Sequence, residues 1–274
     1  MDIIGNDLSI FYQNRIVRLK WHKLRHRIFD APFLRKNLIA GAKLGASLEI
    51  DLRQLACGNF VCLHYPLLEN ETTGIGLVKS AKSEDIIQLR MLETPNQAPL
   101  LLDQIVEILK SVSLHPKFLL QLDIKGSITE DGINLLAASL SPIANHIVAG
   151  GKDWSSIVKL ANIIPNIKFG YNLPDYFRGD QNAWDNFIEY NMNEASLAQT
   201  LYISWRLFTD SIADGINLVE NLKAQNFIVD CWTIDPEYHS YKDLQIILDL
   251  GVDQITTNRP RALCRMWEKH SKNY

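Results

Sequence analysis

The chain has 274 residues, of which 47% are hydrophobic and 22% charged, and its formal net charge is −3. A slightly acidic chain argues against a general nucleic-acid-binding protein, whose binding surface would be basic. No window approaches the roughly 18 apolar residues of a membrane span, and the start, MDIIGNDLSIFYQNR, lacks the basic and apolar regions of a signal peptide. The four cysteines show no CxxC spacing, which indicates reduced thiols in a cytoplasmic protein.

Short apolar runs alternate with segments of helical periodicity, such as 129–140, 155–164 and 241–252. This alternation is typical of βαβ units in a parallel sheet. Eight units fit a chain of this length closed into a (β/α)8 TIM barrel, and we expect one such domain over residues 1–274; a doubly wound open sheet is the alternative. The strands are predicted over residues 15–21, 47–52, 118–125, 146–150, 167–171, 201–205, 227–232 and 253–258.

The run NFVCLHY, residues 59–65, follows the second predicted strand after only a few residues. A parallel crossover needs a dozen residues or more. We therefore expect this run to fold back antiparallel at the carboxyl end of the strand. In a barrel, that end carries the active site.

Two predicted strands carry polar side chains, among them three acids, at every second residue. In SLEIDL, Glu49 and Asp51 share one face, and in FLLQLDIK, Asp123 and Lys125 do so. A polar surface strand is one interpretation of SLEIDL. Both faces of a barrel strand are covered, however, and buried carboxylates need a partner or a metal ion. The pattern therefore favours an all-oxygen site for Mg²⁺ or Ca²⁺, near which Lys125 could pair with a ligand or hold a substrate oxyanion.

Histidines that could supply acid–base chemistry follow two of the strand predictions. His64 lies in the 59–65 run, whereas His22 and His26 follow the first strand within a stretch, 15–36, that is rich in Arg and Lys. That basic stretch is either a solvated surface or an anion-binding rim. Two imidazoles near a metal ion suggest attack on a phosphodiester, because one can deprotonate the nucleophile while the other protonates the leaving alkoxide.

Five segments, in order along the chain, resemble motifs of the glycerophosphodiester phosphodiesterases. GAKLGASLEIDLR resembles that family's Gly-Ala-x-x-Ile-Glu-x-Asp segment, and CLHYPLLENETTGIGLV its His-Asp-x-x-Leu-x-x-Thr-Thr-x-Gly-x-Gly segment. LQLDIK is similar to its Glu-Ile-Lys strand, CWTID to its Trp-Thr-Val-Asn strand, and GVDQITTNRP to its closing Gly-Val-Asp-Gly-Ile-x-Thr-Asp-x-Pro. The five are distributed along nearly the whole chain.

The resemblance implies a (β/α)8 barrel that hydrolyses glycerophosphodiesters to glycerol 3-phosphate and an alcohol, in lipid metabolism. It also implies a divalent cation, Mg²⁺ or Ca²⁺, and two catalytic histidines. Carried over residue by residue, the resemblance implies Glu49, Asp51 and Asp123 as metal ligands, His64 and Lys125 as catalytic residues, and Trp232 as a wall of the substrate pocket.

The chain departs from the family pattern in three places. The opening His-Arg-Gly is altered to WHKLRHRIFDAPF, in which His26-Arg27 keeps the dipeptide and His22 keeps the position. The first catalytic histidine therefore stays open between His22 and His26, and the substrate-binding arginine between Arg25 and Arg27. Asp123 stands where the family usually has Glu, and Tyr65 replaces the Asp that follows the second histidine.

Three functions follow from these observations. The first is hydrolysis of a small-molecule glycerophosphodiester. The second is lysophospholipase D or sphingomyelinase D-like conversion of a lysolipid to a cyclic phosphate, with peripheral contact to a membrane, because Asp-x-Lys, WTID and TTN also look like the sphingomyelinase D-type phospholipases. The third is a catalytically inactive barrel that binds phosphodiesters, which the altered His-Arg-Gly motivates. Segments 170–184 and 234–241 are expected to form loops that set head-group preference.

Overall fold

A computed structural model of the chain describes residues 7–271. The chain divides into two compact units: unit 1 comprises residues 1–22, 26–28 and 169–274, and unit 2 comprises residues 23–25 and 29–168. The prediction of a single domain over residues 1–274 stays a prediction.

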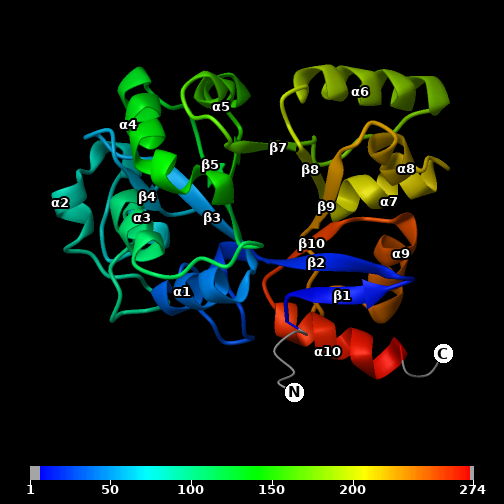
Figure 1. Ribbon diagram of the computed structural model, residues 1–274, viewed down its shortest axis with the longest axis horizontal. Helices are drawn as coiled ribbons and strands as arrows, with labels where there is room; N and C mark the ends of the chain where they lie inside the picture. Colours follow the sequence, from blue (N-terminus) through cyan, green and yellow to red (C-terminus); the bar gives the residue numbers. More distant parts are fainter. Residues whose placement is uncertain (1–6, 272–274) are drawn as a thin grey trace. The chain divides into compact units, whose positions relative to one another are not determined.

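Unit 1 contains a sheet whose strands follow the order β1-β2-β10-β9-β8-β7, parallel except for the antiparallel pair β1–β2. Figure 1 shows the β1–β2 hairpin beside α10, with which both strands are in contact. The sequence did not predict β1. The elements of this unit are β1 (Ser9–Tyr12), β2 (Arg15–Trp21), β7 (Lys168–Asn172, beginning at the unit boundary), α6 (Gln181–Glu194), β8 (Thr200–Ser204), α7 (Trp205–Ala213), α8 (Leu218–Lys223), β9 (Ile228–Trp232), α9 (Tyr241–Leu250), β10 (Gln254–Thr257) and α10 (Pro260–Ser271).

Unit 2 contains the strand order β6-β5-β3-β4, in which only β4 runs antiparallel to its neighbour. β4 is the middle of the 59–65 run, so the predicted antiparallel return is confirmed. The elements are α1 (Arg35–Leu44), β3 (Ser47–Gln54), β4 (Phe60–Cys62), α2 (Ser83–Ile86), α3 (Leu102–Lys110), β5 (Leu119–Ile124), α4 (Glu130–Leu140), β6 (Ile147–Gly151) and α5 (Trp154–Lys159).

The fold is a (β/α)8 barrel, as predicted. Its parallel strands β2, β3 and β5 to β10 alternate with helices along the chain. Each of these eight strands lies within two residues of its predicted bounds. Of the two segments expected to be loops, 170–184 overlaps β7 and α6, so only its central residues are irregular, whereas 234–241 lies between β9 and the first residue of α9.

Local sequence explains where the helices begin and end. The Thr129 side chain accepts a hydrogen bond from Gly132 N at the start of α4, and Ser240 with Asp243 forms a capping box at the start of α9. Helix α9 ends at Gly251, whose φ of 95° lies in the left-handed region that glycine enters without steric cost. These signals fix the helices independently of the barrel.

Alternation along β3 and β5 separates the hydrophobic core from the polar side chains. Leu48, Ile50 and Leu52 on β3 are fully buried, as are Leu120 and Leu122 on β5. The acidic residues stand between them in sequence and therefore point to the opposite face. Burial of the leucine and isoleucine face fixes the register, because a slip of one residue would exchange the two faces.

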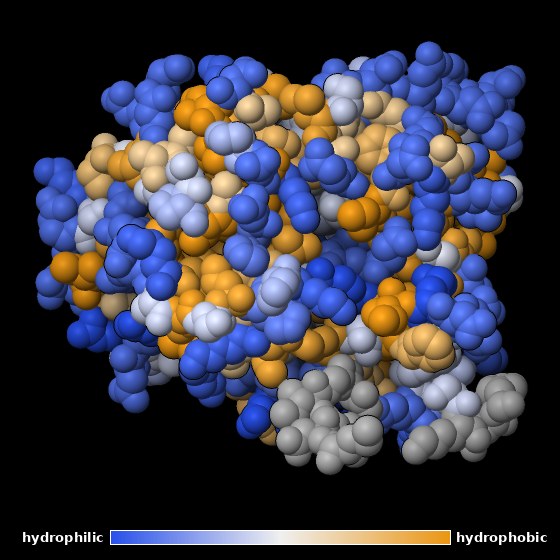
Figure 2. Space-filling model, viewed as in Figure 1, coloured by the Kyte–Doolittle hydropathy of each residue, from blue (hydrophilic) through white to orange (hydrophobic). Residues whose placement is uncertain are grey.

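None of the helices within residues 7–271 combines the length and hydropathy of a transmembrane span. On the face shown in Figure 2, hydrophobic patches are interrupted by hydrophilic side chains.

Candidate active site

Three carboxylates converge in unit 2, as the sequence predicted. The parallel register pairs Asp51 of β3 with Asp123 of β5, and Glu49 lies two residues before Asp51 on the same face. One oxygen from each of the three lies within 4.8 Å of the others. Glu49 and Asp51 are 3% and 1% exposed, whereas Asp123 is partly exposed. Strand pairing alone therefore brings these acids together.

The electrostatics of this acidic trio fit a cation. Burial, together with the charges of Asp51 and Asp123, raises the pKa of Glu49 well above its usual value. Oδ1 of Asp123 is buried and accepts no hydrogen bond within residues 7–271. Three oxygen donors of this kind suit a hard divalent cation such as Mg²⁺ or Ca²⁺. The residues present therefore fit a metal ion.

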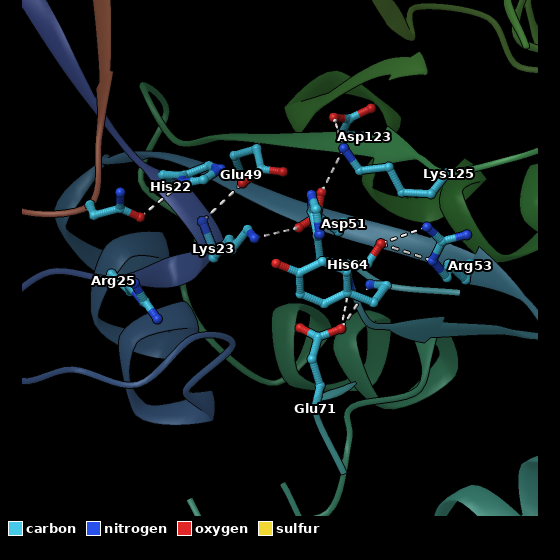
Figure 3. Close-up of polar contacts among 12 residues, drawn as sticks. His22, Lys23, Arg25, Glu49, Asp51, Arg53, His64, Glu71, Asp123 and Lys125 are labelled. Carbon is cyan, nitrogen blue, oxygen red and sulfur yellow. Dashed lines mark hydrogen bonds and ion pairs between the residues drawn. The ribbon is translucent and has the colours of Figure 1, made fainter. Parts of the chain in front are cut away.

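Two lysines partly balance the trio. Nζ of Lys125 lies 2.5 Å from Asp123 Oδ2 and 3.0 Å from Asp51 Oδ1, and Nζ of Lys23 lies 3.7 Å from Asp51 Oδ2. Figure 3 shows Lys125 reaching between the two aspartates. Burial lowers the pKa of Lys125, but the carboxylates of Asp123 and Asp51 outweigh it and raise that pKa above the usual lysine value. Lys125 is therefore a permanent cation beside the trio.

Lys23 also supports the trio through its backbone. Its N–H donates to Glu49 Oε2 over 2.9 Å, and its carbonyl accepts from Phe33 N over 2.7 Å. Its φ of 52° and that of Leu24, 58°, lie in the left-handed region. The family motif has Gly where Leu24 stands if His22 is its histidine, and a glycine would suit such a φ. This chain forms the left-handed turn with two residues other than glycine.

His64 is held by its backbone from two directions. Arg53 Nε and Nη2 donate to the His64 carbonyl over 2.9 and 2.6 Å, and Glu71 Oε2 accepts from the backbone N of His64 and Tyr65 over 2.7 and 2.9 Å. Figure 3 shows both contacts. The ring atom Nδ1 is buried and has no hydrogen-bond partner in the part of the chain described. Burial, together with the charges of Lys23 and Lys125, lowers the pKa of His64, although Asp51 opposes the shift.

His22 lies in unit 1 directly after β2, where its ring contacts Asn258. Nδ1 of His22 is 2.8 Å from Asn258 Oδ1, and Asn258 Nδ2 donates to Asp235 Oδ2 over 2.6 Å. Asp235 also accepts from Thr257 Oγ1 and Asn258 N. An amide oxygen only accepts, so Nδ1 of His22 carries a proton and Nε2 is the ring atom that can exchange one.

The other predicted site residues have different settings. His26 stacks on Trp21 at 4.0 Å between ring centroids, and its Nε2 is 3.0 Å from Asp7 Oδ2. Arg25 pairs with Glu93 at 3.2 Å, whereas Arg27 is exposed.

Trp232, at the end of β9, has an indole Nε1 that is buried without a hydrogen-bond partner among the described residues. That donor is compatible with the predicted pocket wall, which stays a prediction.

The basic side chains of the stretch 15–36 lie in different settings, and Arg27, Arg35 and Lys36 are exposed. Lys20 is buried and pairs with Asp230 at 2.9 Å, Arg15 donates to the carbonyls of Val252 and Leu248, and Lys23 turns to the trio. Alternation along β2 explains the difference, because successive residues of a strand point to opposite faces.

Sequence reasoning missed the residues that support the predicted ones. Lys23 follows His22 directly, and Glu71 lies within the quoted ENETTG segment, so adjacency was the available signal for both. Asp235 and Asn258 lie in the quoted WTID and TTN segments, but no spacing rule indicated that they would meet. Arg53 had no sequence signal beyond its place two residues after Asp51.

Fold and site together define a (β/α)8-barrel protein with an acidic trio at adjacent strands. The family model described as "Glycerophosphoryl diester phosphodiesterase family" matches residues 37–262. The chain belongs to this family and is a glycerophosphodiester phosphodiesterase by that membership. The match begins after β2, so His22 and Lys23 lie outside it. A comparison with curated protein sequences finds no match.

Solved structures support the fold. A putative glycerophosphodiester phosphodiesterase from Galdieria sulphuraria is similar with a TM-score of 0.73 at 15% identity, covering 94% of this chain and 100% of that chain. A putative glycerophosphoryl diester phosphodiesterase from Agrobacterium tumefaciens has a TM-score of 0.69 at 16% identity, covering 94% and 99%. An Oleispira antarctica phosphodiesterase in complex with the product sn-glycerol-3-phosphate has a TM-score of 0.65 at 18% identity, covering 91% and 96%.

Proposed function

We propose that the protein is a divalent-cation-dependent phosphodiesterase that hydrolyses glycerophosphodiesters to sn-glycerol 3-phosphate and an alcohol. The observation that carries the proposal is the acidic trio Glu49, Asp51 and Asp123, whose oxygens lie within 4.8 Å of one another beside Lys125. The product bound by the Oleispira antarctica phosphodiesterase supports the substrate class.

The trio would hold the cation. A bound divalent cation supplies Lewis-acid stabilisation of negative charge on phosphoryl oxygens. Lys125 and Lys23 add two fixed positive charges next to the trio, and positive charge placed where negative charge develops stabilises the transition state. Lys23 thus takes the phosphate-binding role for which the sequence suggested Arg25 or Arg27.

His22 and His64 would move the protons. A water molecule attacks phosphorus as the phosphorus–alkoxide bond breaks, the neutral ring of His22 takes a proton from the water, and His64 in its protonated form gives a proton to the leaving alkoxide. His22 is proposed as the first histidine, because His26 is engaged with Trp21 and Asp7. Nε2 is the atom of His22 that would exchange a proton, since Nδ1 faces Asn258.

One observation favours the alternative of transesterification of a lysolipid to a cyclic phosphate. The pair Asp235–Asn258 that supports His22 comes from WTID and TTN, the segments that resemble the sphingomyelinase D-type phospholipases. In that reaction a substrate hydroxyl replaces water as the nucleophile. Location in the cytoplasm and contact with a membrane stay predictions.

The first experiment measures sn-glycerol 3-phosphate released from a panel of glycerophosphodiesters with Mg²⁺, Ca²⁺ or EDTA. The proposal is supported if EDTA and Asp123→Ala abolish the release of sn-glycerol 3-phosphate. Glu107→Ala is the control and should preserve the release, because Glu107 is an exposed acid on α3. Phosphorus NMR of products from lysolipids identifies a cyclic phosphate if the alternative holds. If neither glycerophosphodiesters nor lysolipids are turned over with Mg²⁺ or Ca²⁺, both reactions are overturned. The remaining hypothesis is then the catalytically inactive barrel that binds phosphodiesters.

A further inference from the structure

Unit 2 contains a groove of about 690 Å³ that the proposed reaction does not use. Its walls come from three segments: the end of β3 with the following turn (53–58), the insertion around Pro66 and Leu77–Lys79, and the loop from Lys125 into α4. A volume of this size lies within the usual range of small-molecule sites, about 300–1,000 Å³.

The groove adjoins the candidate active site because two side chains belong to both. Lys125 lines the groove and binds Asp51 and Asp123, and Arg53 lines it and binds the His64 carbonyl. A phosphodiester with its phosphate near Lys125 would therefore place one of its two substituents in the groove.

The floor of the groove is held in place by hydrogen bonds. The Gln54 side chain donates to Thr129 Oγ1 over 2.7 Å and accepts from Thr129 N over 2.9 Å. These two contacts tie the end of β3 to the loop after β5. The groove is thus built on two adjacent strands, which gives it a defined shape.

The lining chemistry selects among alcohols. Lys79 is exposed and forms no ion pair within residues 7–271, so its charge is available to a ligand beside the cations Arg53 and Lys125. The one acid, Asp131, lies in the first turn of α4, where the helix dipole offsets its charge. No lining residue is aromatic, so the groove offers no ring face for a quaternary ammonium.

We infer that this groove is the subsite for the alcohol portion of the substrate, and that it favours polyol or anionic alcohols over quaternary ammonium alcohols. The inference rests on the proposed function and adds its substrate preference. Lys79 is the specificity-determining residue, because its ammonium contacts no residue of the acidic trio and is free to meet the head group.

The kinetic test compares glycerophosphoinositol and glycerophosphocholine in Lys79→Glu and in a control. We expect the glycerophosphoinositol to glycerophosphocholine ratio of kcat/KM values to fall about tenfold in Lys79→Glu. The variant loses the ammonium that donates hydrogen bonds to the inositol hydroxyls and gains a carboxylate that attracts the choline cation, and each change is worth a few-fold. The control is Lys43→Glu, an exposed lysine in α1 before the amino end of β3, where the same charge change leaves the ratio unaltered. An unaltered ratio in Lys79→Glu would overturn the inference.

A second test reads occupancy without turnover. Cys57 is exposed and lines the groove. Its alkylation by iodoacetamide, followed by intact mass, should slow at least threefold with saturating glycerophosphoinositol and stay unchanged with the same concentration of glycerophosphocholine. Equal alkylation rates of Cys57 in the presence of the two compounds would overturn the inference.

The two tests separate this inference from the proposed function. Protection of Cys57 without any turnover would keep the groove as a binding site and overturn the phosphodiesterase proposal. If the enzyme turns over its substrate, but Cys57 is not protected and Lys79→Glu leaves the kcat/KM ratio unchanged, the groove is not the alcohol subsite. The proposed function would then stand without it.

Discussion

Asn258 Oδ1 lies 2.8 Å from His22 Nδ1, and the same amide donates through Nδ2 to Asp235 over 2.6 Å. Asp235 accepts three hydrogen bonds, two of them from Asn258, so the amide cannot turn over without facing its oxygen to a carboxylate. These hydrogen bonds hold the proton of His22 on Nδ1. Nε2 is therefore the ring atom that can accept a proton.

Asn258→Leu should lower kcat by about 10- to 100-fold with little change in KM, because His22 loses the acceptor that orients its ring. Steady-state kinetics on a glycerophosphodiester measures the effect, with Asn182→Leu on the exposed face of α6 as the matched control. An unchanged kcat would contradict the positioning role of Asn258.

The exchanged pair Asp235→Asn with Asn258→Asp tests the same contact in another way. It keeps a hydrogen bond between the two positions and places a carboxylate against His22 Nδ1, which raises the pKa of His22. The acid limb of the pH profile of kcat/KM should then move to higher pH. With a raised pKa, the His22 imidazole becomes protonated, and can no longer accept a proton, at a higher pH than in the unaltered protein. A profile that stays in place would show that His22 is not the titrating group.

Glu71→Ala should destabilise the fold by about 1–3 kcal/mol, because the backbone N–H groups of His64 and Tyr65 lose their acceptor. We expect kcat to fall as well, since the His64 ring moves with its backbone. Urea denaturation and kinetics measure the two effects. Glu69→Ala is the control, because Glu69 accepts from Gly76 N at an exposed site; a loss of equal size there would contradict the specific role of Glu71.

Asp123→Asn should weaken Mg²⁺ or Ca²⁺ binding at least tenfold, because it removes one charge of the acidic trio while keeping the side chain's shape. Isothermal titration calorimetry on metal-free protein measures affinity without any substrate. Glu107→Gln on α3 is the control. Equal affinity in Asp123→Asn would exclude Asp123 as a metal ligand.

Lys20→Met should destabilise the protein by about 3–5 kcal/mol, because Asp230 is fully buried and would lose its charged partner. Chemical denaturation measures the change. The matched control is Lys223→Met, whose exposed pair with Asp253 spans a similar 2.8 Å but should cost less than about 1 kcal/mol. Similar losses in the two variants would show that burial does not set the cost.

Alkylation should modify Cys57 and spare the buried Cys62, Cys231 and Cys264. Although slight burial raises the pKa of Cys57, the hydrogen bond with Ser83 and nearby backbone N–H groups lower it below the usual value, whereas burial raises the pKa of Cys264 to about 12. The midpoint of the modification rate against pH should therefore lie below that of an unperturbed cysteine, and Ser83→Ala should move the midpoint upward. Modification of a second cysteine in the folded protein would contradict the burial assignments.

The sequence by itself determined the strands, the helices and the acidic trio. Alternation in SLEIDL and LQLDIK states which side chains share a face, and adjacent parallel strands bring those faces together, so Glu49, Asp51 and Asp123 needed no further information. The (β/α)8 order followed in the same way from periodicity and from connection lengths.

Only the tertiary structure decided what surrounds these residues. It placed Lys23 beside the acidic trio, because a left-handed turn directs its N–H to Glu49 and its ammonium to Asp51. It brought Asp235 and Asn258, 23 residues apart, into one hydrogen-bonded unit, and set Glu71 against the His64 backbone. Such contacts depend on the path of the backbone between elements, for which residue spacing gives no rule, whereas contacts within paired strands follow from their register.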